Sequence, residues 1–214
     1  MTTCTAHQPN LLPGMSVVSK VAASDVVIWL DRVQITKGGF TNRNRLPDGS
    51  WLTVPVEKHC AFKPINQVRI GNPAGDWRGR MVNDIQSAWG DSPVVEAVST
   101  EILRPYGLLV GLNAAVLQVL MVELAPDCRW AWQSHLDSGH AVVAVSDDAE
   151  QLLPISDRLA MMTVEVGADT YLSGPSGRRY LDETPFLERG LKVEYWQWDG
   201  PNPCALEVAG RVKA

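Results

Sequence analysis

The sequence lacks the features typical of proteins that bind nucleic acids or span membranes. Its 19 basic residues are outnumbered by 24 acidic ones, the formal net charge is −5, and no basic run is longer than Arg178-Arg179. This balance argues against binding to a nucleic-acid backbone. The one segment apolar enough to test as a membrane span, 107–125, contains Asn113, Gln118 and Glu123, so we expect a buried helix there.

Cysteine is scarce and dispersed. The four cysteines stand at positions 4, 60, 128 and 204, too far apart for a CxxC metal pair or a small disulfide scaffold. Histidines 59, 135 and 140 show no metal-ligand spacing, and the adjacent side chains of His59 and Cys60 are not expected to face each other. We therefore expect no metal, no other cofactor and, since the chain does not begin with a charged and then apolar leader, a cytoplasmic protein.

The chain begins with the pattern of a βαβ unit. Residues 2–6 can form a strand, 14–23 a crossover helix and 26–30 a second, fully apolar strand. Both strands of such a unit point the same way, so His7 and Asp31 would emerge at the same carboxyl edge of the sheet, where open α/β folds bind ligands.

The remaining elements complete an α/β pattern. We predict one domain over residues 1–214, with a mixed, mainly parallel sheet flanked by helices, a possible insertion at 137–153 and a Pro- and Gly-rich tail at 199–214. The predicted strands lie at 33–37 (or an extended arm), 51–56, 68–70, 130–132, 170–172 and 191–195. Helices are predicted at 77–89, 93–103, 108–124 and 155–166, from Arg178 onward, and at 184–190.

His7 and Asp31 are the candidate catalytic residues. An imidazole with an ordinary pKa of about 6.5 suits a general base that takes a proton from an attacking amine or hydroxyl, and a carboxylate can orient it. His7 could instead hydrogen-bond the backbone beside Pro9, and Asp31 could cap a helix or pair with Arg32 or Lys37. Cys4, in the first strand, is expected to be a buried and inert thiol.

Other polar residues near this stretch are candidates for substrate binding. The guanidinium of Arg43 could clamp a phosphate or carboxylate, or it could tie a long loop to the sheet. Gln34 and Lys37 are weaker candidates, because alternating polar residues normally face water. The predicted substrate-binding residues in this part of the chain are Gln8, Asn10, Gln34, Lys37, Asn42, Arg43 and Asn44.

A small-residue loop, Ser173-Gly174-Pro175-Ser176-Gly177, follows the strand at 170–172. Backbone N–H groups at such a place suit an anion or an oxyanion, and Ser173 and Ser176 would add hydroxyl donors. The loop is not the Gly-x-Ser-x-Gly elbow of serine nucleophiles, and it could also be a plain turn.

These blocks together resemble the WbqC-like family of bacterial proteins, found with polysaccharide and natural-product genes. The resemblance covers residues 3–198 and is carried by His7-Gln8-Pro9-Asn10, Asp31-Arg32-Val33-Gln34, Asn42-Arg43-Asn44, the stretch 51–56 and the stretch 167–182. The chain differs at Leu11 and Gly14, where the family usually has aromatic residues, at Arg32, which replaces a second aspartate, and in its tail, where the family has an apolar helix.

The family is suggested to include glycine transferases that modify amino sugars of O-antigens. The resemblance therefore implies transfer of an acyl or glycyl-type aminoacyl group to an amine of a sugar or natural-product intermediate. A coenzyme A or acyl carrier protein thioester donor would give Arg43 or Lys37 a phosphate to hold. Hydrolysis or cyclisation of an acyl thioester, and a non-catalytic protein that binds a sugar or a carrier, remain alternatives.

Overall fold

The computed structural model describes residues 1–73, 75–140, 142–146 and 149–211, and for 142–146, 149–152 and 211 the backbone alone. The chain forms two compact units, each taken by itself below. Unit 1 contains residues 1–7, 19–32 and 127–199; unit 2 contains 8–18, 33–126 and 200–214. The chain passes from unit 1 to unit 2 directly after His7 and again directly after Arg32.

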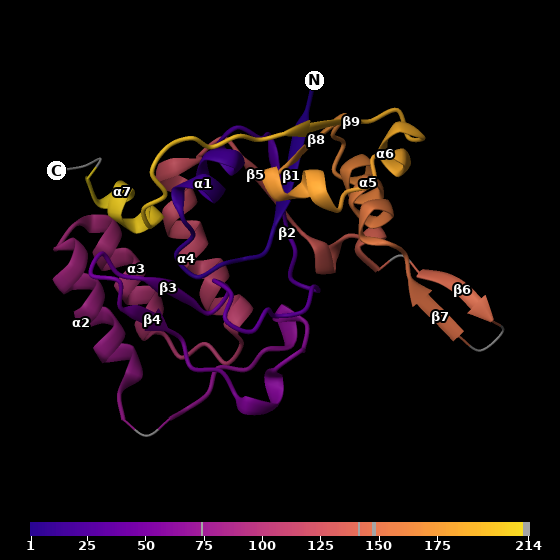
Figure 1. The fold of residues 1–214 in the computed structure, drawn as a ribbon. Coiled ribbons are helices and arrows are strands. Elements are labelled where there is room, and N and C mark those ends of the chain that lie inside the picture. The colour runs from indigo at the N-terminus through magenta and orange to yellow at the C-terminus, as the bar shows by residue number, and fades with distance from the viewer. Residues whose placement is uncertain (74, 141, 147–148, 212–214) are drawn as a thin grey trace. The chain divides into compact units, whose positions relative to one another are not determined.

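A five-stranded sheet forms the centre of unit 1 (Figure 1). Its strands are β1 (Thr3–His7), β2 (Val26–Trp29), β5 (Arg129–Trp132), β8 (Thr170–Ser173) and β9 (Lys192–Tyr195). The strand order is β5-β2-β1-β8-β9, and every neighbouring pair is parallel. The predicted α/β class is thus confirmed, and all five carboxyl ends lie at one edge of the sheet.

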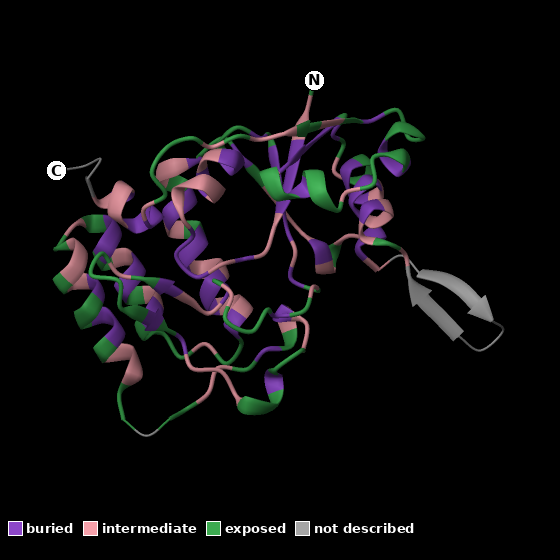
Figure 2. Cartoon of the chain, in the orientation of Figure 1, coloured by how far each residue is buried: buried purple, intermediate pink, exposed green. Residues whose placement is uncertain are grey.

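One face of this sheet is buried against helices. Cys4 and Ala6 of β1 and Val26 and Ile28 of β2, two residues apart as strand geometry requires, belong to the same apolar cluster as Tyr171. Helices α5 (Ile155–Glu165) and α6 (Thr184–Leu187) contribute further members of that cluster. Figure 2 shows buried positions along the strands and on α5. Each large side chain enclosed there contributes about 1.5–3 kcal/mol to folding.

The rest of unit 1 consists of short elements. Antiparallel strands β6 (Val142–Ser146) and β7 (Ala149–Leu152) fall within the predicted insertion. The prediction of a helix that begins at Arg178 was wrong, because a 3-10 helix, η5, spans Pro175–Arg179 and ends one residue after that position. Pro175 supplies the fixed φ that suits the first helical position, so the helix starts three residues earlier than predicted. The other 3-10 helices are η3 (Gln133–His135) and η4 (Ser138–His140).

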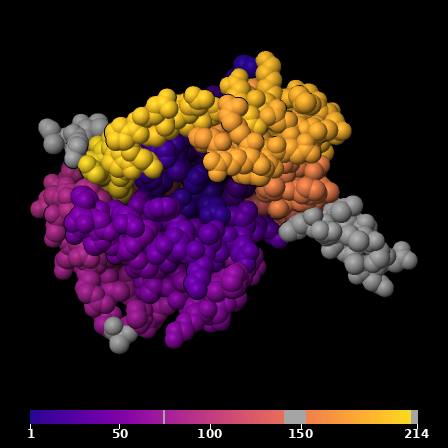
Figure 3. All heavy atoms as spheres, viewed as in Figure 1, coloured from indigo at the N-terminus to yellow at the C-terminus, as the bar shows by residue number. Residues whose placement is uncertain are grey.

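Unit 2 is mainly helical. Its helices are α2 (Trp77–Trp89), α3 (Pro93–Leu103), α4 (Leu109–Leu124) and α7 (Ala205–Arg211), and its strands β3 (Arg43–Arg45) and β4 (Trp51–Thr53) form an antiparallel hairpin. Two 3-10 helices, η1 (Lys58–Cys60) and η2 (Ile65–Gln67), lie in the loops that follow. In the space-filling view the purple atoms of the hairpin region and the magenta atoms of α2 lie side by side (Figure 3).

The helix boundaries follow local signals in the sequence. Asp76 caps α2 by accepting the N–H of Gly79 at 2.9 Å, and Ser92 caps α3 by accepting that of Val95 at 3.3 Å. Gly90 ends α2 with a φ of 72°, a conformation that glycine adopts without steric cost. α4 is apolar, as predicted, and no helix in the described part of the chain is long and apolar enough to cross a membrane.

Two segments of unit 2 were not fixed by the sequence pattern. The Pro- and Gly-rich tail contains a helix that was not predicted, because α7 forms within it and buries Ala205, Leu206 and Ala209. Of the two alternatives for residues 33–37, the regular strand is not found; Gln34 makes a single antiparallel bridge with Pro64. Proline has no N–H to continue a ladder, which limits pairing at that point.

Candidate functional site

In unit 1, His7 is the last residue of β1 and lies at the carboxyl edge of the sheet. It is half-buried and stands in register with Trp29 on the neighbouring strand. The His7 carbonyl accepts the N–H of Leu30 at 2.8 Å, which fixes the backbone at this point. Paired residues on adjacent strands project to the same side, so the His7 and Trp29 side chains share one face of the sheet.

Trp29 brings an unused donor to this face. Its side chain is fully buried and packs edge-on against Trp130, with ring centroids 5.5 Å apart. The indole N–H is enclosed, yet it has no hydrogen-bond partner among the described residues. A buried N–H without a partner is uncommon, and this one belongs to the residue that stands in register with His7. Sequence reasoning took Trp29 only as part of an apolar strand.

Asp31 lies just beyond the end of β2 and is only 3% exposed. Its carboxylate accepts the backbone N–H of Ser134 at 2.9 Å, at the beginning of η3. Next to it, the N–H of Arg32 donates to the side-chain oxygen of Gln133 at 3.3 Å. Asp31 therefore joins the ends of β2 and β5, and no ion pair with Arg32 or Lys37 is found among the described residues.

Lys20, on helix α1 (Met15–Ala22), is a functional candidate that the sequence analysis missed. Its side chain is 5% exposed, and its ammonium donates to the carbonyl of Ala6, directly before His7, at 3.1 Å. A Cβ at Gly174 would lie 4.0 Å from Lys20 Nζ, so the ammonium also reaches the small-residue loop. The available signal was its position three residues after Val17, on the apolar side of the helix.

The environment of Lys20 disfavours its charge. Burial lowers its pKa from 10.5 to about 8, although the nearby Cys4 thiol acts in the opposite direction. In the part of the chain that the structure describes, no carboxylate lies within ion-pair distance of this ammonium. A buried lysine held by a backbone carbonyl is costly to the fold, and such groups concentrate at functional sites.

The small-residue loop is more closely packed than expected. Ser173 is 2% exposed, and its hydroxyl donates to the Gly174 carbonyl at 3.3 Å. A Cβ at Gly177 would lie only 2.0 Å from the Ser173 oxygen, so the loop needs glycine there. Ser173 is enclosed rather than presented as a nucleophile, whereas Ser176 is exposed.

The other predicted substrate-binding residues lie in unit 2. Gln8 accepts the hydroxyl of Thr41 at 3.2 Å, and Asn10 is half-buried. The buried Asn113 of α4 joins the segment that contains Pro9 to the segment that contains Thr41. Its amide donates to the carbonyls of both residues, each at 2.7 Å. A lone amide in an otherwise apolar helix was the signal for this contact.

The side chains of Asn42, Arg43 and Asn44 make different contacts. Asn42 donates to the carbonyl of Val54 at 2.9 Å, and Asn44 is buried, donating to the carbonyl of Leu12 and accepting the N–H of Arg45. Both asparagines thus make structural contacts within unit 2. Arg43 instead lies with its guanidinium carbon 3.9 Å from the centre of the Trp51 ring.

Arg43 lines a cavity of about 230 Å³ in unit 2. The Lys37 and Asn42 positions also border this cavity, whereas Gln34 is exposed and does not. The lining residues are Ile35, Thr36, Lys37, Gly38, Asn42, Arg43, Thr53, Val56, Glu57, Lys58, Cys60, Ala61 and Phe62. The structure therefore brings Lys37, Asn42 and Arg43 together.

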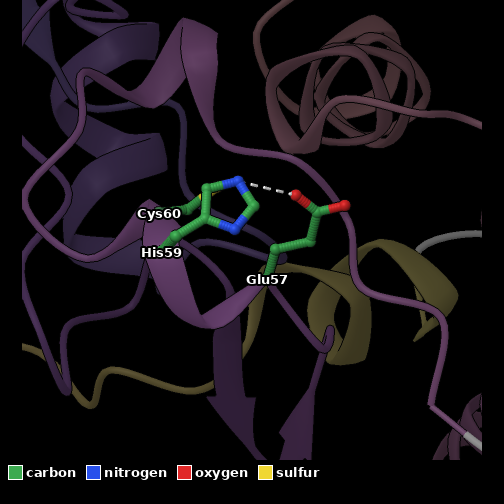
Figure 4. A group of neighbouring side chains, drawn as sticks. All are labelled: Glu57, His59 and Cys60. Carbon is green, nitrogen blue, oxygen red and sulfur yellow. Dashed lines mark ion pairs between the residues drawn. The ribbon is translucent and has the colours of Figure 1, made fainter.

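A possible metal-ligand group includes Glu57 and Cys60 of the same cavity lining. The ligand atoms of Glu57, His59 and Cys60 lie within 4.8 Å of one another (Figure 4), although His59 and Cys60 were not expected to converge. His59 Nε2 lies 3.0 Å from a Glu57 carboxylate oxygen, and the Cys60 sulfur accepts the N–H of Arg69 at 3.3 Å. The imidazole and the carboxylate already satisfy each other, so this geometry does not require an ion.

Comparison with known proteins identifies the chain at the level of its family. The sequence profile of the WbqC-like protein family matches residues 8–203, and the chain belongs to this family. It is 27% identical over 202 residues to the uncharacterized protein Rv1507c of Mycobacterium tuberculosis, a match that covers 90% of this chain and 81% of that protein. No solved structure matches the chain.

Proposed function

We propose that this protein transfers an acyl or glycyl-type aminoacyl group from a thioester to an amine of a sugar or natural-product intermediate. The observation that carries the proposal is the pairing of His7 with Trp29 at the carboxyl edge of a parallel sheet. One residue carries an imidazole, the side chain most often used as a general base, and the other offers a buried N–H without a partner among the described residues. Acyl transfer needs both kinds of group.

In the proposed reaction, His7 and the Trp29 N–H have different roles. His7 takes the proton of the amine as its nitrogen attacks the thioester carbon, and the thiolate then leaves with the bonding electron pair and is protonated. Negative charge develops on the carbonyl oxygen between these steps. The Trp29 N–H and the Lys20 ammonium are donors of the type that stabilises such an oxyanion.

The other predicted site residues have supporting parts in this proposal. Asp31 holds the sheet edge through the N–H of Ser134 and positions the chain around His7. The loop that contains Ser173 and Ser176 shapes the neighbouring edge and approaches the Lys20 ammonium. Arg43 and Lys37 are the candidates, within unit 2, for binding an anionic group such as that of coenzyme A or an acyl carrier protein.

The test is a reconstituted transfer reaction. The purified protein is incubated with glycyl and short acyl thioesters of coenzyme A and of a carrier protein, with and without amino-sugar acceptors, and the products are followed by mass spectrometry. We expect an amide product that requires the acceptor. Free acid formed at the same rate without acceptor would indicate hydrolysis, and thioester binding without any turnover would indicate a carrier-binding protein; either result contradicts the proposal.

A further inference from the structure

The cavity of unit 2 carries an excess of positive charge. Three cationic residues line it, Lys37, Arg43 and Lys58, and the one acidic residue in its lining is Glu57. The Glu57 carboxylate is paired with His59 at 3.0 Å. Among the residues that the structure describes, no carboxylate lies within ion-pair distance of any of the three cations. Their charges are thus available to an anion.

Arg43 is held in place before any ligand binds. One face of its guanidinium lies over Trp51, and one of its terminal nitrogens donates to the Gly38 carbonyl. Its Nε is buried and has no hydrogen-bond partner in the described structure. A fixed guanidinium with an unused N–H recognises phosphate or carboxylate oxygens with little further loss of side-chain freedom.

The apolar part of the cavity indicates that the ligand is more than a bare ion. Phe62 lies in the lining, is 73% exposed and has a φ of 71°, a left-handed conformation that is unfavourable for a bulky residue. Such conformations persist where the surroundings impose them and concentrate at ligand sites. An exposed aromatic ring beside three cations suits an organic molecule that carries a phosphate.

We propose that this cavity binds the phosphate group of a small phosphoester, with the adjoining organic chain against Phe62. That the phosphoester is the phosphopantetheine arm of the acyl donor rests on the proposed function. A nucleotide sugar, as acceptor, would supply the same phosphate chemistry. Binding to the cavity needs no turnover, so the two proposals can be tested separately.

The experiment is isothermal titration calorimetry of the full-length protein with 4′-phosphopantetheine and with pantetheine, which lacks the phosphate. We expect 4′-phosphopantetheine to bind at least about tenfold more tightly. Arg43→Gln should weaken binding of 4′-phosphopantetheine by about tenfold or more. Arg45→Gln is the matched control, because Arg45 also lies over Trp51, at 4.4 Å, but does not line the cavity; we expect less than about a twofold change.

Because Arg43 also contacts Gly38, thermal unfolding must show that the Arg43→Gln variant folds. Lys58→Gln, at an exposed position of the same lining, is a second test of the phosphate site by the same titration. Equal binding of pantetheine and 4′-phosphopantetheine, or equal effects of Arg43→Gln and Arg45→Gln, would overturn the proposal. Binding of a uridine diphosphate sugar but not of 4′-phosphopantetheine would keep the phosphate site and overturn its assignment to the donor. Phosphoester binding without acyl transfer would refute the proposed function alone.

Discussion

The two units hold their polar groups in opposite ways. In unit 1, Lys20 and the Trp29 indole are enclosed next to His7 at the end of a parallel sheet. In unit 2, Lys37 and Lys58 are exposed around a cavity, and only part of Arg43 is buried. Enclosed groups act strongly on a bound reactant because little water screens them, whereas exposed cations attract an anion at low cost to the fold. In the proposed function, unit 1 performs the chemistry and unit 2 recognises the charge of the ligand.

The strongest test of this division is the removal of the proposed base. His7→Ala should lower the rate of amide formation by about 10²–10⁴-fold, the usual contribution of a general base. Binding of 4′-phosphopantetheine, measured by calorimetry, should stay unchanged, because no cavity residue is altered. His135→Ala, at an exposed histidine of unit 1, is the control and should retain full activity. A His7 variant that transfers acyl groups at the wild-type rate would refute the proposed base.

The next test concerns the indole N–H of Trp29. Trp29→Phe keeps an aromatic ring but removes the donor, and we expect kcat to fall by about 10²-fold if the N–H meets the oxyanion. The free energy of unfolding should change by no more than about 2 kcal/mol, because the lost ring contacts are offset in part by removal of an unpartnered N–H.

Trp130→Phe is the matched control for this change, since Trp130 packs against the same indole. Steady-state kinetics and urea denaturation should be measured on both variants. An equal fall in kcat for the two variants would mean that Trp29 acts through packing alone.

Lys20 should be costly to stability and necessary for activity. Its pKa in the folded protein, about 8, lies below the 10.5 of an unburied lysine, so the unfolded chain binds more protons between these values. The free energy of unfolding of the wild type therefore rises with pH from about 8 to 10.5, by an amount on the order of 3 kcal/mol. Lys20→Met should remove most of that dependence, stabilise the protein near pH 7 and lower kcat.

Urea denaturation at a series of pH values measures this effect. Lys192→Met, at an exposed lysine of unit 1, should leave the pH dependence unchanged. If Lys20→Met destabilised the protein at pH 7 and kept full activity, Lys20 would be a structural residue and the proposed electrostatic role would be wrong.

The smallest expected effect is in unit 2 and concerns stability. Asn113→Leu removes two hydrogen bonds and leaves the carbonyls of Pro9 and Thr41 without this donor, at a cost of about 2 kcal/mol. Gln118→Leu, at an exposed position of the same helix, should change the free energy of unfolding by less than about 0.5 kcal/mol. Equal effects in denaturant titrations would show that Asn113 does not hold these segments together.

Much of the fold followed from local sequence patterns. α2 and α3 have the predicted limits because a capping side chain, a first-turn proline or a terminal glycine marks the ends. β1 and β2 formed the parallel pair expected from the first thirty residues. The sequence left 33–37 open between a strand and an extended arm, and it did not predict the helix at 205–211. A single bridge partner and burial in unit 2 decided these segments rather than periodicity.

The sequence by itself determined the family, the α/β class and the placement of His7 and Asp31 at strand ends, because these depend on short motifs and on hydrophobic periodicity. The tertiary structure alone decided which polar groups have partners. In the folded protein Lys20 is buried, and the Trp29 N–H has no hydrogen-bond partner among the described residues. Asp31 accepts the N–H of Ser134, and Asn42 and Asn44 donate to backbone carbonyls. Burial and pairing depend on residues distant in the chain, so no local pattern in one sequence encodes them.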